Sequence, residues 1–328
     1  MQQNKPEITV ILSAFNAEHD IAKSVNSILT QSFQNFELLI ADDCSTDNTK
    51  KIIEAFTDNR IRKFYNTNNK HLVETWNELA QHAKGKYIIF HDADDTINPK
   101  RLELLYNHAE ANPNLALVGS NYLRQFPKWK ETRKSNFGLT HYDIWTAFEK
   151  HKRVELIKPL IKKSIFEEFG GFRPFFSRLG WEDYDLYLRI MEKYEVGNIS
   201  EALYDYNYTP NSSSKLDLNK INFKKLFISN IGVYLHSQRK QYGFDAIMDH
   251  SLLPEFNQFL KKLEDDFITS PELVYERIAR NQIANKDFIA AFSNVKNYLS
   301  IRKDNSKTWS LFLFWLKSAL KALIKYIK

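Results

Sequence analysis

The segment Asp92-Ala93-Asp94-Asp95 places three carboxylates within four residues. Carboxylates this close repel one another unless a cation lies among them. Oxygen ligands of this kind suit Mg²⁺ or Mn²⁺, ions that commonly also bind substrate phosphates. The alternative is a solvated acidic turn that caps a helix beginning near Pro99. Asp92, Asp94 and Asp95 are therefore candidates for a metal site, and the acidic turn stays open as the alternative.

A second acidic pair, Asp42-Asp43, directly follows an apolar run. A carboxylate in this place can accept a hydrogen bond from a nucleotide base or ribose. Either acid could instead cap the helix predicted near Thr49. We favour the binding function because the pair lies at a predicted strand end.

A third acidic group, Trp181-Glu182-Asp183, follows the Gly170-Gly171 break and begins a helical pattern. A carboxylate at a helix start can point into a cleft and serve as a general base, which contributes about 10²–10⁴-fold in rate. The alternative is that these acids only stabilise the positive end of the helix dipole. The sequence of this segment alone does not distinguish a general base from a helix-capping acid.

The elements that must position these groups follow from hydrophobic periodicity. Short apolar runs predict strands, and amphipathic helices are predicted between them; the strands cover 8–12, 36–41, 61–65, 87–90 and 115–119. Such alternation indicates a parallel sheet with helices on both faces. Ligands bind at the carboxyl ends of the strands in such sheets, so the acids after strands 36–41 and 87–90 should meet at one edge.

The rest of the chain is predicted from weaker signals. Residues 120–155 show no clean period and are expected to form loops and short helices beside the site. A turn-rich stretch at 207–216 suggests a boundary, and helical patterns follow it. We therefore predict a catalytic domain over 1–210 and a helical extension over 211–328.

Composition narrows the function classes. The chain has 328 residues, 43% of them hydrophobic and 26% charged, which excludes a wholly disordered or fibrous protein. The single cysteine, Cys44, excludes an intrachain disulfide and a cysteine-rich zinc site. A net charge of +6 points to an anionic partner: nucleic acid, an anionic membrane or a phosphorylated substrate.

Two basic segments account for the positive charge. Residues 124–134 carry five basic residues and one acid, and could meet a phosphorylated acceptor or form a solvated loop. Residues 309–328 form a predicted amphipathic helix with four lysines, no acid and an apolar face. Lysines near mid-bilayer oppose spanning, so this helix is expected to lie on an anionic membrane surface or to pack on protein. Nucleic acid is not expected as a partner.

Four ordered motifs over the first 210 residues resemble the inverting nucleotide-sugar glycosyltransferases of family 2, which have the GT-A fold. The resemblance rests on Val10–Glu18, Ala41–Thr49 with Cys44 where glycine is usual, Gly85–Asp95 with the DxD motif, and Gly170-Gly171-Phe172 followed by Trp181–Leu186. It implies an α/β fold: a Rossmann-like, mostly parallel sheet flanked by helices, with a C-terminal helical extension.

The resemblance also implies roles for individual residues. Asp183 would be the catalytic base, and Trp181 and Glu182 would contact the acceptor. Asp92 and Asp94 would hold Mn²⁺ or Mg²⁺. The donor would be bound by Ser13, Ala14, Phe15, Glu18, Asp43, His71, Asp92 and Asp95, with Asp43 on the base, expected to be uracil. Thr209 stands where relatives often carry a histidine, so the resemblance leaves open whether the protein supplies a third ligand for the metal.

The predicted function is therefore inverting sugar transfer from a nucleotide-sugar, expected to be a UDP-sugar. The acceptor would be a glycan or lipid-linked sugar in surface polysaccharide synthesis. The alternatives are a nucleotidyltransferase with a similar sheet and metal site, and a non-catalytic basic membrane-binding protein. No signal peptide or long apolar span is apparent, so the protein is expected in the cytoplasm, peripheral on the cytoplasmic face of the membrane.

Overall fold

A computed structural model describes residues 5–126, 129–207, 221–301 and 306–327. The chain divides into two compact units, Met1–Gln125 with Thr132–Asn207, and Phe126–Glu131 with Tyr208–Lys328. The predicted boundary, between 1–210 and 211–328, placed residues 126–131 in the first domain. Thr209 lies outside the described residues.

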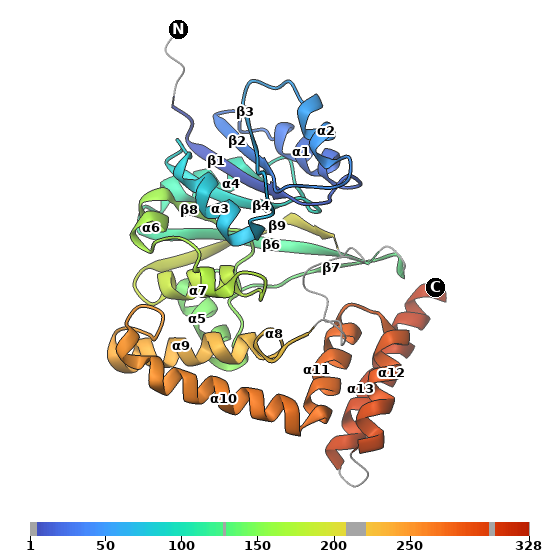
Figure 1. Cartoon of the computed structure of the whole chain (residues 1–328). Helices are drawn as coiled ribbons and strands as arrows, with labels where there is room; N and C mark the ends of the chain where they lie inside the picture. The colour runs from blue at the N-terminus through green and yellow to red at the C-terminus, as the bar shows by residue number, and fades with distance from the viewer. Residues whose placement is uncertain (1–4, 127–128, 208–220, 302–305, 328) are drawn as a thin grey trace. The chain divides into compact units, whose positions relative to one another are not determined.

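The first unit is built on a nine-stranded sheet with helices on both faces (Figure 1). The strand order is β3-β2-β1-β4-β8-β6-β9-β5, and β7 pairs with β6. The strands are β1 (Ile8–Ala14), β2 (Phe36–Asp42), β3 (Ile61–Tyr65), β4 (Tyr87–Asp92), β5 (Thr96–Ile97), β6 (Leu115–Phe126), β7 (Glu131–Lys134), β8 (Leu160–Lys162) and β9 (Glu195–Asn207).

The helices of this unit fall between the strands, as the alternating pattern predicts. They are α1 (Ile21–Leu29), α2 (Thr49–Ala55), α3 (His71–Gln81), α4 (Arg101–Ala111), α5 (His141–His151), α6 (Lys163–Glu168) and α7 (Glu182–Met191). The strands β1, β2, β3 and β4 are mutually parallel, whereas β8 runs antiparallel to both β4 and β6. The predicted α/β, mostly parallel sheet flanked by helices is confirmed.

Both faces of the sheet are buried because alternate side chains of one strand enter different cores. Ile89 of β4 packs in the cluster that contains Val25 of α1. Its neighbour Phe90 faces the opposite side, where its ring centroid lies 5.0 Å from that of Trp76 on α3. A strand buried on both sides must be continuously apolar, which is why these runs could be recognised in the sequence.

The expectation of loops over 120–155 is wrong in part. Strand β6 continues from Leu115 to Phe126, and β7 pairs with it. Helix α5 begins at a capping box in which Thr140 and Asp143 bond reciprocally. The polar composition of this strand pair hides the strand period, because only part of β6 is buried.

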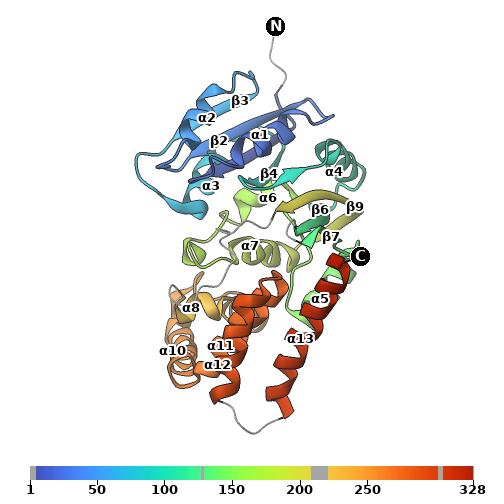
Figure 2. The same ribbon diagram turned by 90° about the vertical axis from the view of Figure 1, so that its right-hand side faces the viewer.

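The second unit is helical. Its helices are α8 (Phe223–Leu226), α9 (Ile228–Tyr242), α10 (Leu253–Thr269), α11 (Pro271–Ala284), α12 (Phe288–Ile301) and α13 (Ser306–Ile327). Helices α11, α12 and α13 pack together (Figure 2). The segment 126–131 belongs here because Trp129 packs its ring 5.3 Å from Phe288 and donates to the Lys286 carbonyl at 3.2 Å. The predicted C-terminal helical extension is confirmed.

Candidate active site

The carboxyl ends of β1, β2 and β4 lie side by side, as the parallel sheet predicts. Ala14 of β1 is in register with Asp42 of β2, and Ser13 is in register with Asp92 of β4. Ser13 and Ala14 are buried, whereas Phe15, which follows them, is 49% exposed. The sheet thus brings the first two acidic segments of the sequence to one edge.

The loops after β1 and β2 are joined to each other by polar contacts. The backbone N–H groups of Asn16 and Ala17 donate to Ser45 Oγ at 3.0 Å and Thr49 Oγ1 at 2.7 Å. Glu18 Oε2 accepts from both the backbone and the side-chain nitrogen of Asn48, and these bonds lower the pKa of Glu18. In this geometry Glu18 positions the loops.

Asp43 is 2% exposed, and its carboxylate holds the start of α3. One oxygen accepts from Asn66 Nδ2 at 2.7 Å and from the Lys70 N–H at 3.0 Å, and the other accepts from the His71 N–H at 2.8 Å. Its neighbour Asp42 is also buried, but Asp42 Oδ1 has no hydrogen-bond partner among the residues described. Buried acceptors are normally satisfied, so Asp42 Oδ1 is a second candidate to meet a ligand at this edge.

The three aspartates after β4 have three different environments. Asp92 Oδ2 forms an ion pair with Lys158 Nζ at 3.0 Å. Burial and the charge of Asp92 raise the pKa of Asp94 to about 6. Asp95 is 1% exposed and accepts from the Tyr204 hydroxyl and the Asn207 N–H, both at 2.7 Å. Asp95 therefore ties β4 to β9 and acts as a positioning residue.

Helix α7 starts at the predicted acidic pair. Two successive left-handed residues, Gly180 (φ 83°) and Trp181 (φ 75°), turn the chain so that α7 begins at Glu182. The Trp181 ring lies edge-on to that of Tyr184, with centroids 5.6 Å apart. Asp183 Oδ1 accepts from the Tyr184 N–H at 2.8 Å.

The start of α7 is close enough to the end of β4 for their charged side chains to interact. Burial raises the pKa of Asp183, while Lys158 and the hydrogen bond from Tyr184 act against this rise and Asp92 adds to it. Burial and Asp183 raise the pKa of Glu182, and Lys158 again opposes the rise. The structure thus gathers Asp92, Glu182 and Asp183 around one lysine.

Lys158 was not singled out from the sequence. Burial alone would lower its pKa, but the charges of Asp92, Asp183 and Glu182 raise the pKa above its ordinary value. In the sequence this lysine simply follows two apolar residues and precedes a proline, and nothing in that pattern indicates a buried lysine beside three carboxylates. The signal is tertiary, since β8, which follows Lys158, pairs with β4.

The Gly170-Gly171 break is a packing site for α3. Asn77 Nδ2 donates to the Phe172 carbonyl at 2.8 Å, and the Phe172 N–H donates to Asn77 Oδ1 at 3.0 Å. Gly171 has φ 71°, and an added Cβ would lie 2.6 Å from Asn77 Oδ1. Glycine is therefore required there on both conformational and steric grounds.

The residues at the end of β4 fit a metal that is shared with substrate phosphates. Among the described residues, no group of three or more His, Cys, Asp or Glu side chains could enclose a metal alone. Mg²⁺-type sites commonly use one or two carboxylates plus phosphate oxygens. The raised pKa of Asp94 shows that its anionic form would gain from a nearby cation.

The basic segment 124–134 is divided between the two units. The Arg124 guanidinium lies 5.3 Å from the ring centroid of Tyr206, and Lys130 is exposed in the other unit. Lys128 lies outside the described residues.

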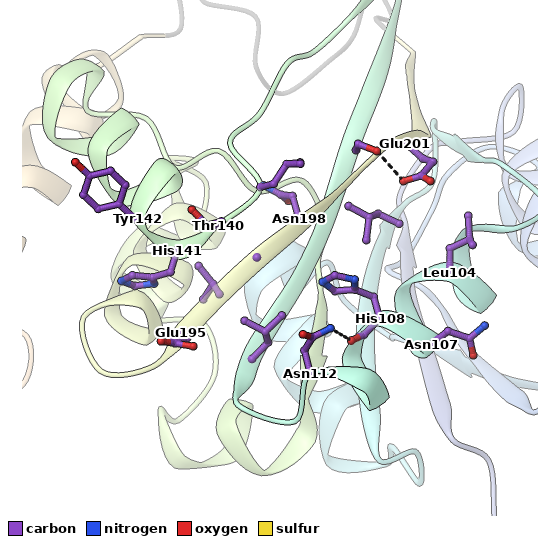
Figure 3. Close-up of a pocket in the computed structure, with 16 residues that line it drawn as sticks. Leu104, Asn107, His108, Asn112, Thr140, His141, Tyr142, Glu195, Asn198 and Glu201 are labelled. Atoms are coloured by element: carbon purple, nitrogen blue, oxygen red, sulfur yellow. Dashed lines mark hydrogen bonds between the residues drawn. The ribbon is translucent and has the colours of Figure 1, made fainter.

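A cavity of about 970 Å³ in the first unit holds none of the predicted site residues. It is lined by the end of α4, the start of α5 and the first half of β9 (Figure 3). His108 from α4 and His141 from α5 both border it, with Glu195 of β9 nearby (Figure 3). The candidate active site is defined by the strand ends and not by this cavity.

A curled α/β sheet with acidic strand ends and an acidic helix start is the arrangement of the GT-A transferases. The model of the glycosyl transferase family 2 matches residues 9–180, so the chain belongs to this family and is a glycosyltransferase. This result does not support the nucleotidyltransferase and non-catalytic alternatives.

Relatives and solved structures agree with the family. The chain is 31% identical over 209 residues to the putative glycosyltransferase EpsE of Bacillus subtilis, covering 61% of this chain and 72% of EpsE. It is 35% identical to the UDP-Glc:alpha-D-GlcNAc-diphosphoundecaprenol beta-1,3-glucosyltransferase WfgD of Escherichia coli, covering 35% of this chain but only 45% of WfgD. The structure of S. aureus TarS 1-349 in complex with UDP-GlcNAc superimposes with a TM-score of 0.57 over 89% of each chain, at 17% identity, which shows the shared fold.

Proposed function

We propose that the protein transfers a sugar, with inversion, from a UDP-sugar to a lipid-linked or glycan acceptor in polysaccharide synthesis. The observation that carries this proposal is the convergence of Asp92 with Glu182 and Asp183 at the strand-end edge. The printed name of WfgD describes a UDP-sugar donor and a diphosphoundecaprenol-linked acceptor, and TarS was crystallised with UDP-GlcNAc. Both support the donor class proposed here.

Asp183 is proposed as the general base. It takes the proton of an acceptor hydroxyl while that oxygen forms a bond to the anomeric carbon. The bond from this carbon to the diphosphate breaks, and the nucleoside diphosphate leaves with the electron pair from the opposite face. Its raised pKa suits a base, because a carboxylate with a higher pKa accepts a proton more readily.

The donor would lie across the ends of β1, β2 and β4. Ser13, Ala14 and Phe15 line this edge, and the base would bind at Asp42 and Asp43. Because three donors already engage the Asp43 carboxylate, the unpartnered Asp42 Oδ1 is the stronger candidate for direct contact with the base. Asp94 and Asp92 would hold Mn²⁺ or Mg²⁺, which offsets the charge on the leaving diphosphate.

The test is donor turnover in Asp183→Asn. Loss of the base should lower kcat for UDP release in the presence of acceptor by about 10²–10⁴-fold, with little change in UDP affinity. Glu192→Gln, at the exposed residue that directly follows α7, serves as the matched control and should keep wild-type turnover. Near wild-type kcat in Asp183→Asn, or a product of retained anomeric configuration by NMR, would refute the mechanism.

The membrane surface is proposed as a partner of α13. Its inner face packs within the second unit, with Leu311 and Ala322 buried and Trp315 Nε1 donating to the Phe288 carbonyl at 2.9 Å. Its outer face is exposed and apolar, and Lys317 and Lys321 are also exposed; the apolar residues are Leu313, Leu320, Leu323 and Ile324. No helix among the described residues is long and apolar enough to cross a bilayer.

Because part of α13 is buried, point variants test this contact better than truncation. Leu320→Ser with Ile324→Ser should reduce cosedimentation with phosphatidylglycerol vesicles, and Lys317→Gln with Lys321→Gln should reduce its preference over phosphatidylcholine vesicles. Equal cosedimentation of both double variants and the wild type would exclude α13 as the membrane contact.

A further inference from the structure

Lys158 is a buried cation at the candidate active site. It lies in the segment between α5 and β8, and its side chain is 7% exposed. Its Nζ lies 3.0 Å from Asp92 Oδ2 and 4.4 Å from the ring centroid of Trp76. The carboxylate on one side and the aromatic ring on another fix the position of the ammonium group.

The backbone of Lys158 is held as firmly as its side chain. Its φ of 40° lies in the left-handed region, which disfavours a residue other than glycine. The fully buried Arg101 donates to the carbonyls of Ile157 and Lys158, at 3.1 Å and 2.8 Å. A conformation of this kind persists only where the surroundings impose it, and such residues cluster at functional sites.

The ammonium group of Lys158 has more donors than it has acceptors among the described residues. An ammonium group has three N–H donors. Among the residues that the structure describes, Asp92 is its one carboxylate partner at ion-pair distance, although Glu182 and Asp183 are near enough to interact electrostatically. Donors therefore remain for a further acceptor at this point of the site.

We propose that Lys158 supplies a positive charge to the donor site. Its ammonium group pairs with Asp92 and donates a hydrogen bond to the diphosphate of the donor. This inference rests on the proposed function. It has two consequences that a merely structural lysine would not have. Part of the nucleotide affinity is independent of metal, and Lys158 competes with the divalent metal for Asp92.

The experiment compares Lys158→Met with the wild type in two binding assays, after circular dichroism has confirmed folding. In EDTA, which removes divalent metal, calorimetry should show that Lys158→Met binds UDP at least about tenfold more weakly than the wild type, because a charge-assisted contact is lost. Mn²⁺ binding without nucleotide, followed by electron paramagnetic resonance, should become tighter because Asp92 is released.

Two further variants make the comparison specific. Lys158→Arg keeps the charge and should retain most of the metal-free UDP affinity. Lys163→Met removes a lysine that pairs with Glu167 on α6, and should leave both affinities unchanged.

Unchanged UDP and Mn²⁺ affinities in folded Lys158→Met would overturn the inference while leaving the proposed function intact. A wild type that binds UDP neither with nor without Mn²⁺ would overturn the proposed donor and the diphosphate contact together. The Mn²⁺ comparison tests the competition for Asp92 independently of the donor.

Discussion

Asp185 should be the most sensitive residue of α7 for stability, although it is not the proposed base. It is 1% exposed, and its Oδ2 accepts from Arg173 Nε at 2.8 Å and from Arg189 Nε at 3.0 Å, while Arg173 Nη2 pairs with Oδ1. Arg189 also donates to the carbonyls of Phe169 and Gly171. One carboxylate therefore links α7 to the glycine break.

The variant Asp185→Ala removes the carboxylate that two nearly buried guanidinium groups share. Breaking one buried ion pair costs about 3–5 kcal/mol, so we expect a loss of about 4 kcal/mol for opening of this region. At about 1.4 kcal/mol per tenfold, this corresponds to a roughly 10³-fold increase in the opening equilibrium. Local measurement is required because the chain has two units and need not unfold in one step.

Hydrogen–deuterium exchange of peptides covering α7 provides that measurement. Their exchange should be about 10³-fold faster in Asp185→Ala than in the wild type. Glu168→Gln is the matched control, because its pair with Lys193 is exposed and solvent-screened and so contributes little to stability. If Asp185→Ala accelerated exchange by less than about tenfold, the inferred role of the shared carboxylate would be wrong.

Three further predictions concern other parts of the chain. Asp43→Ala should lower the melting temperature and weaken UDP binding, because it leaves donors at the start of α3 unsatisfied at about 1–3 kcal/mol each; an unchanged melting temperature would contradict this. In a pH–kcat profile, activity should be full when Asp183 is deprotonated and fall as pH drops through its raised pKa, so the acid limb should lie above 3.8; a limb below that value would exclude Asp183 as the base. Glu131→Gln should destabilise the second unit by about 3 kcal/mol, since Lys286, 2% exposed, loses its partner carboxylate; peptides of α11 and α12 that exchange as in the wild type would refute this.

The strand-end acids could be predicted because their signal is local. An apolar run that stops at Asp42 or Asp92 identifies both the strand and the edge at which the carboxylate lies. The same holds for α7, where the break at Gly170 and the acids at Glu182 and Asp183 are close in the chain. Periodicity and composition suffice when the residues that matter belong to one element.

The remaining site residues could not be predicted because their partners are distant in sequence. Tyr204, which binds Asp95, lies on β9, a strand whose pairing with β6 is interrupted by register shifts. Lys158 reaches Asp92 only because β8 inserts between β4 and β6. Neither residue carries a pattern of its own, and in a chain with 46 basic residues a single lysine is not conspicuous.

The three neighbouring aspartates also show why an acidic motif does not by itself define a metal site. Asp92 pairs with Lys158, and Asp95 accepts hydrogen bonds from Tyr204 and Asn207, so both side chains already have partners within the protein. Burial beside Asp92 leaves Asp94 with a pKa of about 6, and a cation would stabilise its charged form. A divalent ion at this edge should therefore need phosphate oxygens as further ligands, since no group of three or more such side chains among the described residues could hold it alone. It follows that metal affinity measured without nucleotide should be weak in the wild type and should rise when UDP supplies the missing oxygens, whereas a preformed protein cage would bind Mn²⁺ equally well in both conditions.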